Sequence, residues 1–206
     1  MSLLIIGLTG QTGAGKSTVS NLFREAGLNV IDCDTVSRTV TQKGEPALDA
    51  IAKAFSPSVL TETGELDRKA LGNLVFNDGD ALDLLNRTIF PFIFDHLENE
   101  CKALEEQGES LVILDAPTLY ESGADKLCLQ VLGVCADKET RKERIMARDG
   151  LTEEEAVARM NSQHSEEFFR THCRAVIENN GDPEALRRQV ETTISQLVAM
   201  SKTFSK

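Results

Sequence analysis

The sequence contains few aromatic residues, which make up 5% of its 206 residues and include one tyrosine and no tryptophan. Aliphatic side chains must therefore supply most of the core packing, as is usual in layered α/β proteins. Hydrophobic residues account for 41% of the chain. A chain of this length can bury the core of one domain together with a subdomain.

Positive charge is in the minority, because 22 Lys and Arg residues face 33 Asp and Glu residues, for a net charge of −11. Binding to nucleic acid or to an anionic membrane depends on a basic field, so we expect neither as a partner. Small anionic ligands remain compatible with this composition, since they need only a local cationic pocket.

The five cysteines are odd in number and scattered, and no C-x-x-C pair occurs. Neither a zinc cluster nor a disulfide framework is indicated, so we expect free thiols in a reducing compartment. The apolar start is too short to span a membrane and lacks the basic region of a signal peptide. These features predict a cytoplasmic protein.

Strand, glycine-rich loop, helix and strand follow one another at the start of the chain. The apolar run 3–8 predicts a buried strand, 16–26 a helix, and 28–32 a second strand. This βαβ order implies a parallel sheet with a right-handed crossover. Further strands are predicted at 111–115, 129–136 and 175–179.

The stretch 35–108 shows no strong strand and is helical in character, with its longest helical pattern interrupted by Pro91. A helical insertion is the simplest explanation. Later helices carry start signals, with Asp137 as a candidate cap, Thr152 and Glu155 as a capping box, and Asp182 before Pro183. The sequence thus predicts a sheet between helical layers, with a helical insertion and a helical lid.

The segment GQTGAGKST matches the phosphate-binding loop (P-loop), with Gly10-x-x-x-x-Gly15-Lys16-Ser17 between a strand and a helix. Loop N–H groups are expected to surround the β-phosphate, Lys16 to reach the β- and γ-phosphates, and Ser17 to bind Mg²⁺. The residues predicted to bind ATP here are Gly13, Ala14, Gly15, Lys16, Ser17 and Thr18.

Other P-loop classes leave no trace in the sequence. The D-x-x-G and N-K-x-D segments of a GTPase are missing, and motor or AAA-type ATPases normally need a longer chain. A small-molecule kinase remains, which must shield the γ-phosphate from water and place an acceptor hydroxyl beside it. A nucleotide-sensing module without transfer activity is the alternative from another class.

Carboxylates follow two of the predicted strands. Asp32 and Asp34 in VIDCD, if extended, point to one face about 7 Å apart, at a strand end where a carboxylate can accept the acceptor's proton. Alternatively, Asp34 caps the helix that follows. Asp115 ends LVILD in the pattern of a group that orients Mg²⁺ through water, or it is simply a strand-terminating residue.

Arg141, Arg144 and Arg148 recur on one face of a predicted helix. Such a face is usually only solvated. This helix follows the fourth predicted strand, where kinases of this class carry a lid, so we expect Arg144 and Arg148 to close over the phosphates. The three histidines, His96, His164 and His172, lack ligand spacing and favour surface or packing roles.

Several segments together resemble the dephospho-CoA kinase family over nearly the whole chain. They are GLTGQTGAGKSTVSNLF, VIDCDTVSRTV, KGEPALDAI, LDRKALGNLVF, LDAPTLYESG and CRAVIENNGDPEALRRQV. The P-loop is shared by many families, whereas the run Asp32-x-Asp34-x-x-x-Arg38 with the late V-I-x-N-N-G is far more specific. The resemblance implies transfer of the ATP γ-phosphate to the ribose 3′-hydroxyl of dephospho-CoA, with Mg²⁺, in the last step of coenzyme A synthesis.

The resemblance also implies residue roles and a fold. Asp34 would be the base, acting with Lys16 and Arg144 as catalytic residues, while Arg148 and Asn180 would contact ATP. The expected substrate-binding residues are Thr9, Asp32, Asp34, Arg38, Leu119, Tyr120 and Glu121. The expected fold is a three-layer α/β/α sandwich of P-loop kinase type with a five-stranded parallel sheet. Its core would comprise 1–40 and 109–206, with a lid at about 138–165 and a CoA-binding insertion at 41–108.

The sequence departs from the family pattern in three places. Gln11, Thr12 and Ala14 stand in a loop that is typically G-G-I-G-S-G-K-S, although the spacing and essential glycines remain. Phe90 precedes Pro91 where the family often has His, so any polar contact of that His is absent. Arg141 stands where the family often has Gln and receives no family role. A monomer is the favoured oligomeric state.

Overall fold

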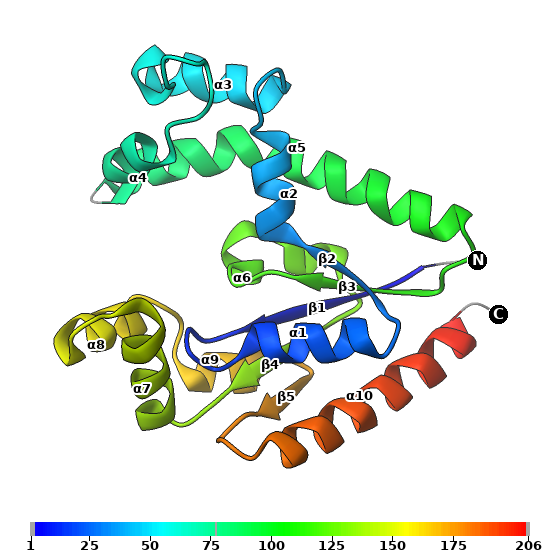
Figure 1. The fold of residues 1–206 in the computed structure, drawn as a ribbon. Coiled ribbons are helices and arrows are strands. Elements are labelled where there is room, and N and C mark those ends of the chain that lie inside the picture. The colour runs from blue at the N-terminus through cyan, green and yellow to red at the C-terminus, as the bar shows by residue number, and fades with distance from the viewer. Residues whose placement is uncertain (1–2, 77, 205–206) are drawn as a thin grey trace. The chain divides into compact units, whose positions relative to one another are not determined.

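A five-stranded parallel sheet forms from the apolar runs of the sequence, with strand order β2-β3-β1-β4-β5 (Figure 1). The computed structural model describes residues 3–76 and 78–204. The strands are β1 (Leu4–Gly10), β2 (Asn29–Asp32), β3 (Leu111–Asp115), β4 (Gln130–Cys135) and β5 (Ala175–Glu178). All five predicted strands are therefore confirmed, with ends that differ by at most two residues.

The central strand β1 pairs in parallel with β3 on one side and with β4 on the other. Leu8 is opposite Asp115 in the β1–β3 register, and Gly10 is opposite Val134 in the β1–β4 register. Parallel pairing places the carboxyl ends of these strands at one edge of the sheet. Loops that follow β1, β3 and β4 therefore meet there, at the position where open α/β sheets bind ligands.

Alternation along β1 divides its side chains between the two faces of the sheet. Leu4, Ile6 and Leu8 are at most 1% exposed and join a core formed with α1 (Lys16–Glu25) and α10 (Pro183–Phe204). Gly7 faces the opposite side, where a Cβ atom would lie 2.5 Å from Leu119 Cδ2. The predicted three-layer α/β/α arrangement is thereby confirmed.

Further helices of this sheet-containing unit begin at polar signals in the sequence. They are α6 (Leu119–Ser122), η2 (Ala124–Leu127), α7 (Lys138–Asp149), α8 (Glu153–Asn161) and α9 (Glu166–His172). The predicted capping box of Thr152 and Glu155 is present at α8, and Asp182 Oδ1 accepts from the Glu184 N–H before α10. Asp137 precedes α7, but its side chain makes no capping hydrogen bond.

Residues 32–103 form a second compact unit, and the first consists of Met1–Ile31 with Leu104–Lys206. The elements that begin in this helical unit are α2 (Cys33–Val40), α3 (Pro46–Phe55), η1 (Pro57–Val59), α4 (Arg68–Phe76) and α5 (Gly79–Glu106). The division places α2 with the helical insertion, whereas the sequence-based boundary at 40/41 assigned it to the core. The assignment of this unit to CoA binding remains a prediction.

The helix α5 continues through Pro91, where the sequence predicted an interruption. Proline cannot donate a backbone hydrogen bond and normally kinks or breaks a helix interior. Pro91 is exposed, so the carbonyl that loses its partner can be hydrated, and the helix carries on past it. Among the described residues, no helix is long and apolar enough to cross a membrane.

The sheet core provides a first stability test. Ile113 on β3 is 0% exposed, so Ile113→Ala should lower the free energy of unfolding by about 2–5 kcal/mol through lost burial and the cavity left behind. Leu129→Ala is the control, because Leu129 is 54% exposed. Denaturant unfolding should show a lower midpoint for the first variant at unchanged slope. Equal midpoints for the two variants would contradict the core described here.

Candidate active site

The P-loop lies between β1 and α1, as its spacing predicted, and its backbone forms a cradle for an anion. Gly13 and Gly15 have φ angles of 77° and 91°, a left-handed conformation that favours glycine. The N–H groups of Gly13, Gly15, Lys16 and Ser17 donate to no other described residue. Since these donors stand at the positive end of α1, the loop is suited to bind phosphate oxygens.

The charged side chains beside the loop come from β3 and the first turn of α1. Lys16 Nζ forms an ion pair with Asp115 Oδ1, and Asp115 is only 5% exposed. The strand register explains this contact, because Asp115 ends β3 next to the end of β1. Ser17 and Thr18 are exposed in the first turn of α1, so their hydroxyls can reach a bound ligand.

Asn179 fastens the P-loop to the end of β5. Its Nδ2 donates to the Ala14 carbonyl at 2.8 Å, and its own N–H donates to the Cys135 carbonyl at 2.9 Å. A Cβ atom on Gly15 would lie 2.2 Å from Asn179 Nδ2, so only glycine fits beside it. The sequence pattern V-I-x-N-N-G contains both asparagines, and the sequence-based prediction selected Asn180 as the ATP contact.

Asn180 has a different and more exposed position. Its Oδ1 accepts from the Asp137 N–H at 2.9 Å and so links the end of β5 to the start of α7. The V-I-x-N-N-G pattern located the segment correctly, but it could not distinguish the buried asparagine from the exposed one.

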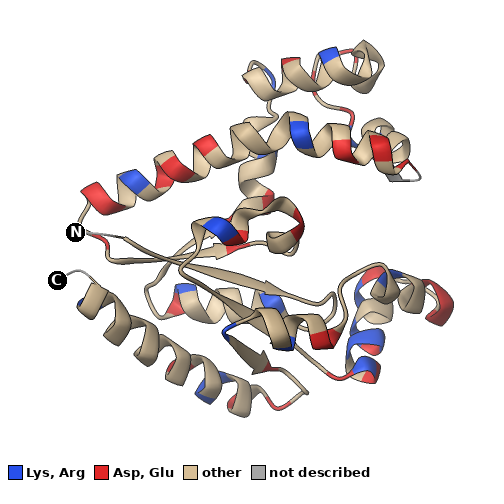
Figure 2. Ribbon diagram, turned by 180° about the vertical axis from the view of Figure 1, so that it is seen from behind, with Lys and Arg blue, Asp and Glu red and all other residues tan. Residues whose placement is uncertain are grey.

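The three arginines of α7 have three different environments, and Lys and Arg gather along this helix in Figure 2. Arg141 is buried, donates from Nε to the Ala136 carbonyl at 3.1 Å, and has a pKa lowered by that burial. Arg144 donates to the carbonyls of Asn179 at 3.0 Å and Gly13 at 3.4 Å. Arg144 is therefore the one of these arginines whose guanidinium contacts the P-loop.

Arg148 is instead held by Asp149, which accepts two hydrogen bonds from it at 2.8 Å each. This carboxylate raises the pKa of Arg148, and the arginine side chain remains 58% exposed. Asp149 also accepts from Arg159 of α8 at 2.6 Å, so it joins the two helices. A contact between Arg148 and ATP requires it to leave Asp149.

A further loop contact comes from the end of the predicted lid. Gln163 Oε1 accepts from the Thr12 N–H at 2.7 Å. Gln11, next to it, is 4% exposed, and its Oε1 has no partner among the described residues. Gln11 and Thr12 both depart from the family pattern, and the contact with Gln163 could not be read from spacing alone.

The predicted acid pair does not have the geometry expected of an extended chain. β2 ends at Asp32, and Asp34 already lies in the first turn of α2. Asp32 Oδ1 accepts from the N–H groups of Asp34 at 2.9 Å and Thr35 at 3.2 Å. Asp32 is therefore the helix cap, rather than Asp34 as the alternative reading had it, because the strand turns into helix at Cys33.

The remaining predicted substrate residues are largely engaged within the sheet-containing unit. Thr9 is buried and donates its hydroxyl to the Pro117 carbonyl at 3.3 Å. Leu119 is 0% exposed and packs against β1, so it cannot contact a substrate in this conformation. The segment LDAPTLYESG does not reveal from sequence alone whether Leu119 faces the core or the solvent.

Tyr120 and Glu121 join α6 to the segment after α8. The Tyr120 hydroxyl donates to the His172 carbonyl at 2.9 Å. The pKa of Tyr120 is raised, mainly because the side chain is partly buried and secondly because of its hydrogen bond with the Cys173 thiol. Glu121 pairs with His164 at 3.4 Å. His164 and His172 both stack on Phe168, with ring centroids 3.8 and 4.0 Å away, which agrees with the predicted packing role.

Comparison with known proteins identifies the family to which this chain belongs. The family model described as dephospho-CoA kinase matches residues 4–184. A dephospho-CoA kinase of Geobacillus kaustophilus is 42% identical over 199 residues, which cover 97% of this chain and 99% of the relative. The chain belongs to the dephospho-CoA kinase family.

Solved structures agree with that membership. A Thermus thermophilus protein is 36% identical with a TM-score of 0.82, covering 96% of this chain and 99% of its own. Dephospho-CoA kinase from Campylobacter jejuni is 26% identical with a TM-score of 0.63, covering 94% of this chain and 96% of its own. Membership in the dephospho-CoA kinase family confirms the predicted P-loop kinase fold and identifies the chain as a kinase.

The two neighbouring asparagines allow a sharp test of the loop. Asn179→Ala removes a buried donor from the Ala14 carbonyl, so the free energy of unfolding should fall by about 1–3 kcal/mol and ATP should bind more weakly. Asn180→Ala is the matched control at an exposed position. Denaturant unfolding and ATP titration measure the two effects. Weaker ATP binding in the Asn180 variant alone would favour the sequence-based choice instead.

Proposed function

We propose that this chain transfers the γ-phosphate of ATP to the ribose 3′-hydroxyl of dephospho-CoA, giving coenzyme A and ADP. The observation that carries the proposal is the convergence of unpaired loop N–H groups with Lys16 and Arg144 at one point of the sheet edge. This donor site occurs in a chain whose family match extends over residues 4–184.

The donor nucleotide is bound mainly by the backbone. The N–H groups at Gly13, Gly15, Lys16 and Ser17 contact phosphate oxygens, while the Thr18 hydroxyl reaches the α-phosphate. Lys16 exchanges its ion pair with Asp115 for the β- and γ-phosphates. Arg144, already on the Gly13 carbonyl, offers its remaining N–H donors to the charge that develops on the transferred group.

Mg²⁺ fits the donors beside the loop, since the Ser17 hydroxyl and the Asp115 carboxylate are the oxygen ligands that it prefers. Ser17 would hold the ion directly and Asp115 through water. When bound, the ion neutralises charge on the β- and γ-phosphates. No group of three or more His, Cys, Asp or Glu side chains suited to a metal occurs in the described residues.

On the acceptor side, Asp34 is the proposed base. Asp32 accepts from the N–H groups of Asp34 and Thr35, the second and third residues of α2, and so fixes the helix turn that carries Asp34. Arg38 follows Asp34 by four residues and therefore lies on the same face of that helix. A base and a cation on one face can contact the two ends of a nucleotide ribose, its hydroxyl and its 5′-phosphate. The role of Asp32 is thus to position Asp34.

The wider setting completes the proposal. The lid, about residues 138–165, closes over the phosphates, and Arg148 reaches them by leaving Asp149. The helical insertion binds the CoA portion of the acceptor. The enzyme acts as a monomer in the cytoplasm, with no nucleic acid or membrane as a partner.

An acceptor panel tests the reaction. With MgATP present, ADP release should depend on dephospho-CoA, while other nucleosides, nucleotides and sugars should give rates close to the blank. The product from dephospho-CoA should carry a new 3′-phosphate by mass and NMR. Faster ADP release with another acceptor would assign the chain to a different kinase reaction. Tight ATP binding without any acceptor-dependent ADP would indicate a nucleotide-binding module.

Removal of the proposed base tests the mechanism. Asp34→Asn keeps the size of the side chain but cannot accept a proton, so kcat should fall by about 10²–10⁴ with the KM for ATP almost unchanged. Asp49→Asn, an exposed carboxylate of the same unit, is the control and should retain full turnover. Near-normal kcat in the Asp34 variant would remove this residue from the chemical step.

A further inference from the structure

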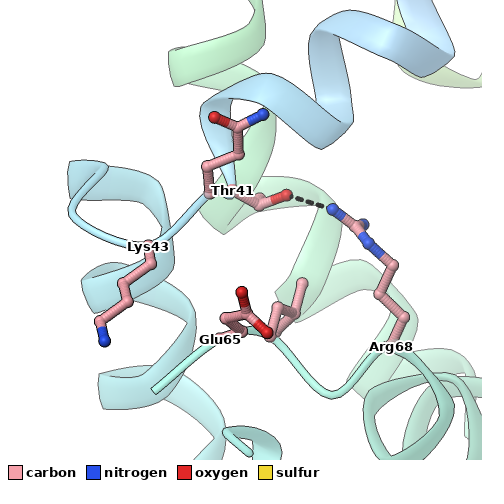
Figure 3. A pocket seen from close by; sticks show the side chains of 6 residues that line it. Thr41, Lys43, Glu65 and Arg68 are labelled. Carbon is pink, nitrogen blue, oxygen red and sulfur yellow. Dashed lines mark hydrogen bonds between the residues drawn. The ribbon is translucent and has the colours of Figure 1, made fainter. Parts of the chain in front are cut away.

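A pocket of about 490 Å³ lies wholly within the helical unit, and none of its lining residues is in the candidate site described above. Figure 3 shows the side chains around it, which are Thr41, Gln42, Lys43, Glu65, Leu66 and Arg68. They come from the segment after α2 and from the segment that leads into α4. The pocket therefore begins where the helix carrying Asp34 and Arg38 ends.

Arg68 is held at this pocket by a buried hydroxyl. Its Nη2 donates to Thr41 Oγ1 at 2.8 Å, the dashed bond in Figure 3. Thr41 is 1% exposed and donates its own proton to the Ser37 carbonyl at 2.7 Å, so its oxygen is fixed as an acceptor. The remaining N–H groups of Arg68 donate to none of the residues the structure describes, which leaves them available to a ligand.

The charges around Arg68 are not balanced by the protein. Partial burial and, after it, the charge of Arg38 lower the pKa of Arg68, so the two guanidinium groups repel each other. Neither arginine forms an ion pair with a described residue. Arg68 is also the first residue of α4, where the helix dipole disfavours a cation.

The other charged residues of the pocket do not relieve this repulsion. Lys43 points away from the pocket in Figure 3 and donates to the Thr63 carbonyl at 2.7 Å. Glu65, the carboxylate that lines the pocket, accepts from the Thr63 hydroxyl at 3.4 Å and makes no ion pair with Arg68. An anion that binds between the two arginines would supply the missing charge.

We propose that Arg68, positioned by Thr41, and Arg38 together bind the diphosphate of the acceptor. The inference rests on the proposed function, because dephospho-CoA carries a diphosphate on the same ribose whose 3′-hydroxyl is phosphorylated. A guanidinium group can donate two parallel hydrogen bonds to one phosphate group. Two arginines can therefore bind the two adjacent phosphate groups of a diphosphate. Asp34 and Arg38 lie one helical turn apart on α2, so the hydroxyl end and the diphosphate end of that ribose meet consecutive turns of one helix face.

Substitution of Arg68 by Gln tests this subsite, with Lys69→Gln as the matched control. Lys69 carries the same charge at the next position but does not line the pocket. R68Q should raise the KM for dephospho-CoA by about tenfold to a hundredfold, the effect of losing charged hydrogen bonds to a phosphate. Its kcat and its KM for ATP should remain within about twofold of wild type, because the lost contact is made equally in the ground and transition states.

Three further measurements separate binding from folding. R68K should recover only part of the affinity, because an ammonium cannot form the paired bonds of a guanidinium. The unfolding midpoint of R68Q should be no lower than that of K69Q, since the substitution removes a repulsion from the free enzyme. Direct titration of dephospho-CoA into both variants should reproduce the ratio of their KM values.

The possible failures are distinguishable. An R68Q variant whose KM for dephospho-CoA equals that of K69Q would overturn the subsite while leaving the wild-type reaction intact. A fall in kcat without a rise in KM would also overturn it, because it would indicate a role in the chemical step or in domain structure. Absence of dephospho-CoA turnover in the wild-type enzyme would overturn the proposed function and the subsite with it.

Discussion

The whole donor site depends on the contact between Gly15 and Asn179. At this point the Asn179 side chain approaches the Gly15 backbone so closely that a Cβ atom on residue 15 would lie 2.2 Å from its carboxamide nitrogen. The contact binds the end of β5 to the loop that follows β1, and the Ala14 carbonyl is satisfied by the same amide. Loop N–H groups can point outward to a phosphate only because the loop carbonyls are anchored from behind. A preorganised cradle of this kind needs little rearrangement when the ligand arrives.

An acidic chain can bind an anion when local groups create a positive potential at the binding site. With a net charge of −11, the protein as a whole repels anions. The P-loop uses backbone dipoles and one lysine, and Arg144 is directed at the loop by carbonyl groups rather than by a carboxylate. Local donors in a fixed arrangement outweigh a distant negative field, which salt screens within about 10 Å. An acidic composition is therefore compatible with a nucleotide site.

The sequence predicted those features that follow from local pattern. Apolar runs located every strand because buried parallel strands must be apolar throughout, and the spacing of Gly10, Gly15 and Lys16 located the phosphate site. A prediction that assumed a particular backbone conformation was wrong. Asp32 and Asp34 were placed on one face of an extended chain, whereas the helix begins at Cys33 and turns Asp32 into its cap. A short strand followed at once by a helix gives no signal of where one conformation ends.

Burial was the other property that local pattern could not supply. Leu119 and Tyr120 are adjacent, yet one is in the core and the other donates to the His172 carbonyl; Asn179 and Asn180 divide in the same way. Strand register and helix packing decide which of two neighbouring residues faces the core. Both depend on contacts between residues far apart in the sequence, such as Asn179 and Ala14, which are more than 100 residues apart.

The environment of Arg68 is unfavourable for the folded protein in the absence of a ligand. A cation at a helix N-terminus beside a second cation is unfavourable for folding, and its fixed hydrogen bond to Thr41 prevents it from turning away. Local arrangements that cost stability are found where binding or catalysis requires them. In the proposed reaction, backbone N–H groups that are unpaired among the described residues bind the donor phosphate, and guanidinium groups without a described counterion bind the acceptor diphosphate. Both sites attract a ligand because the folded protein alone leaves their hydrogen-bonding capacity unsatisfied.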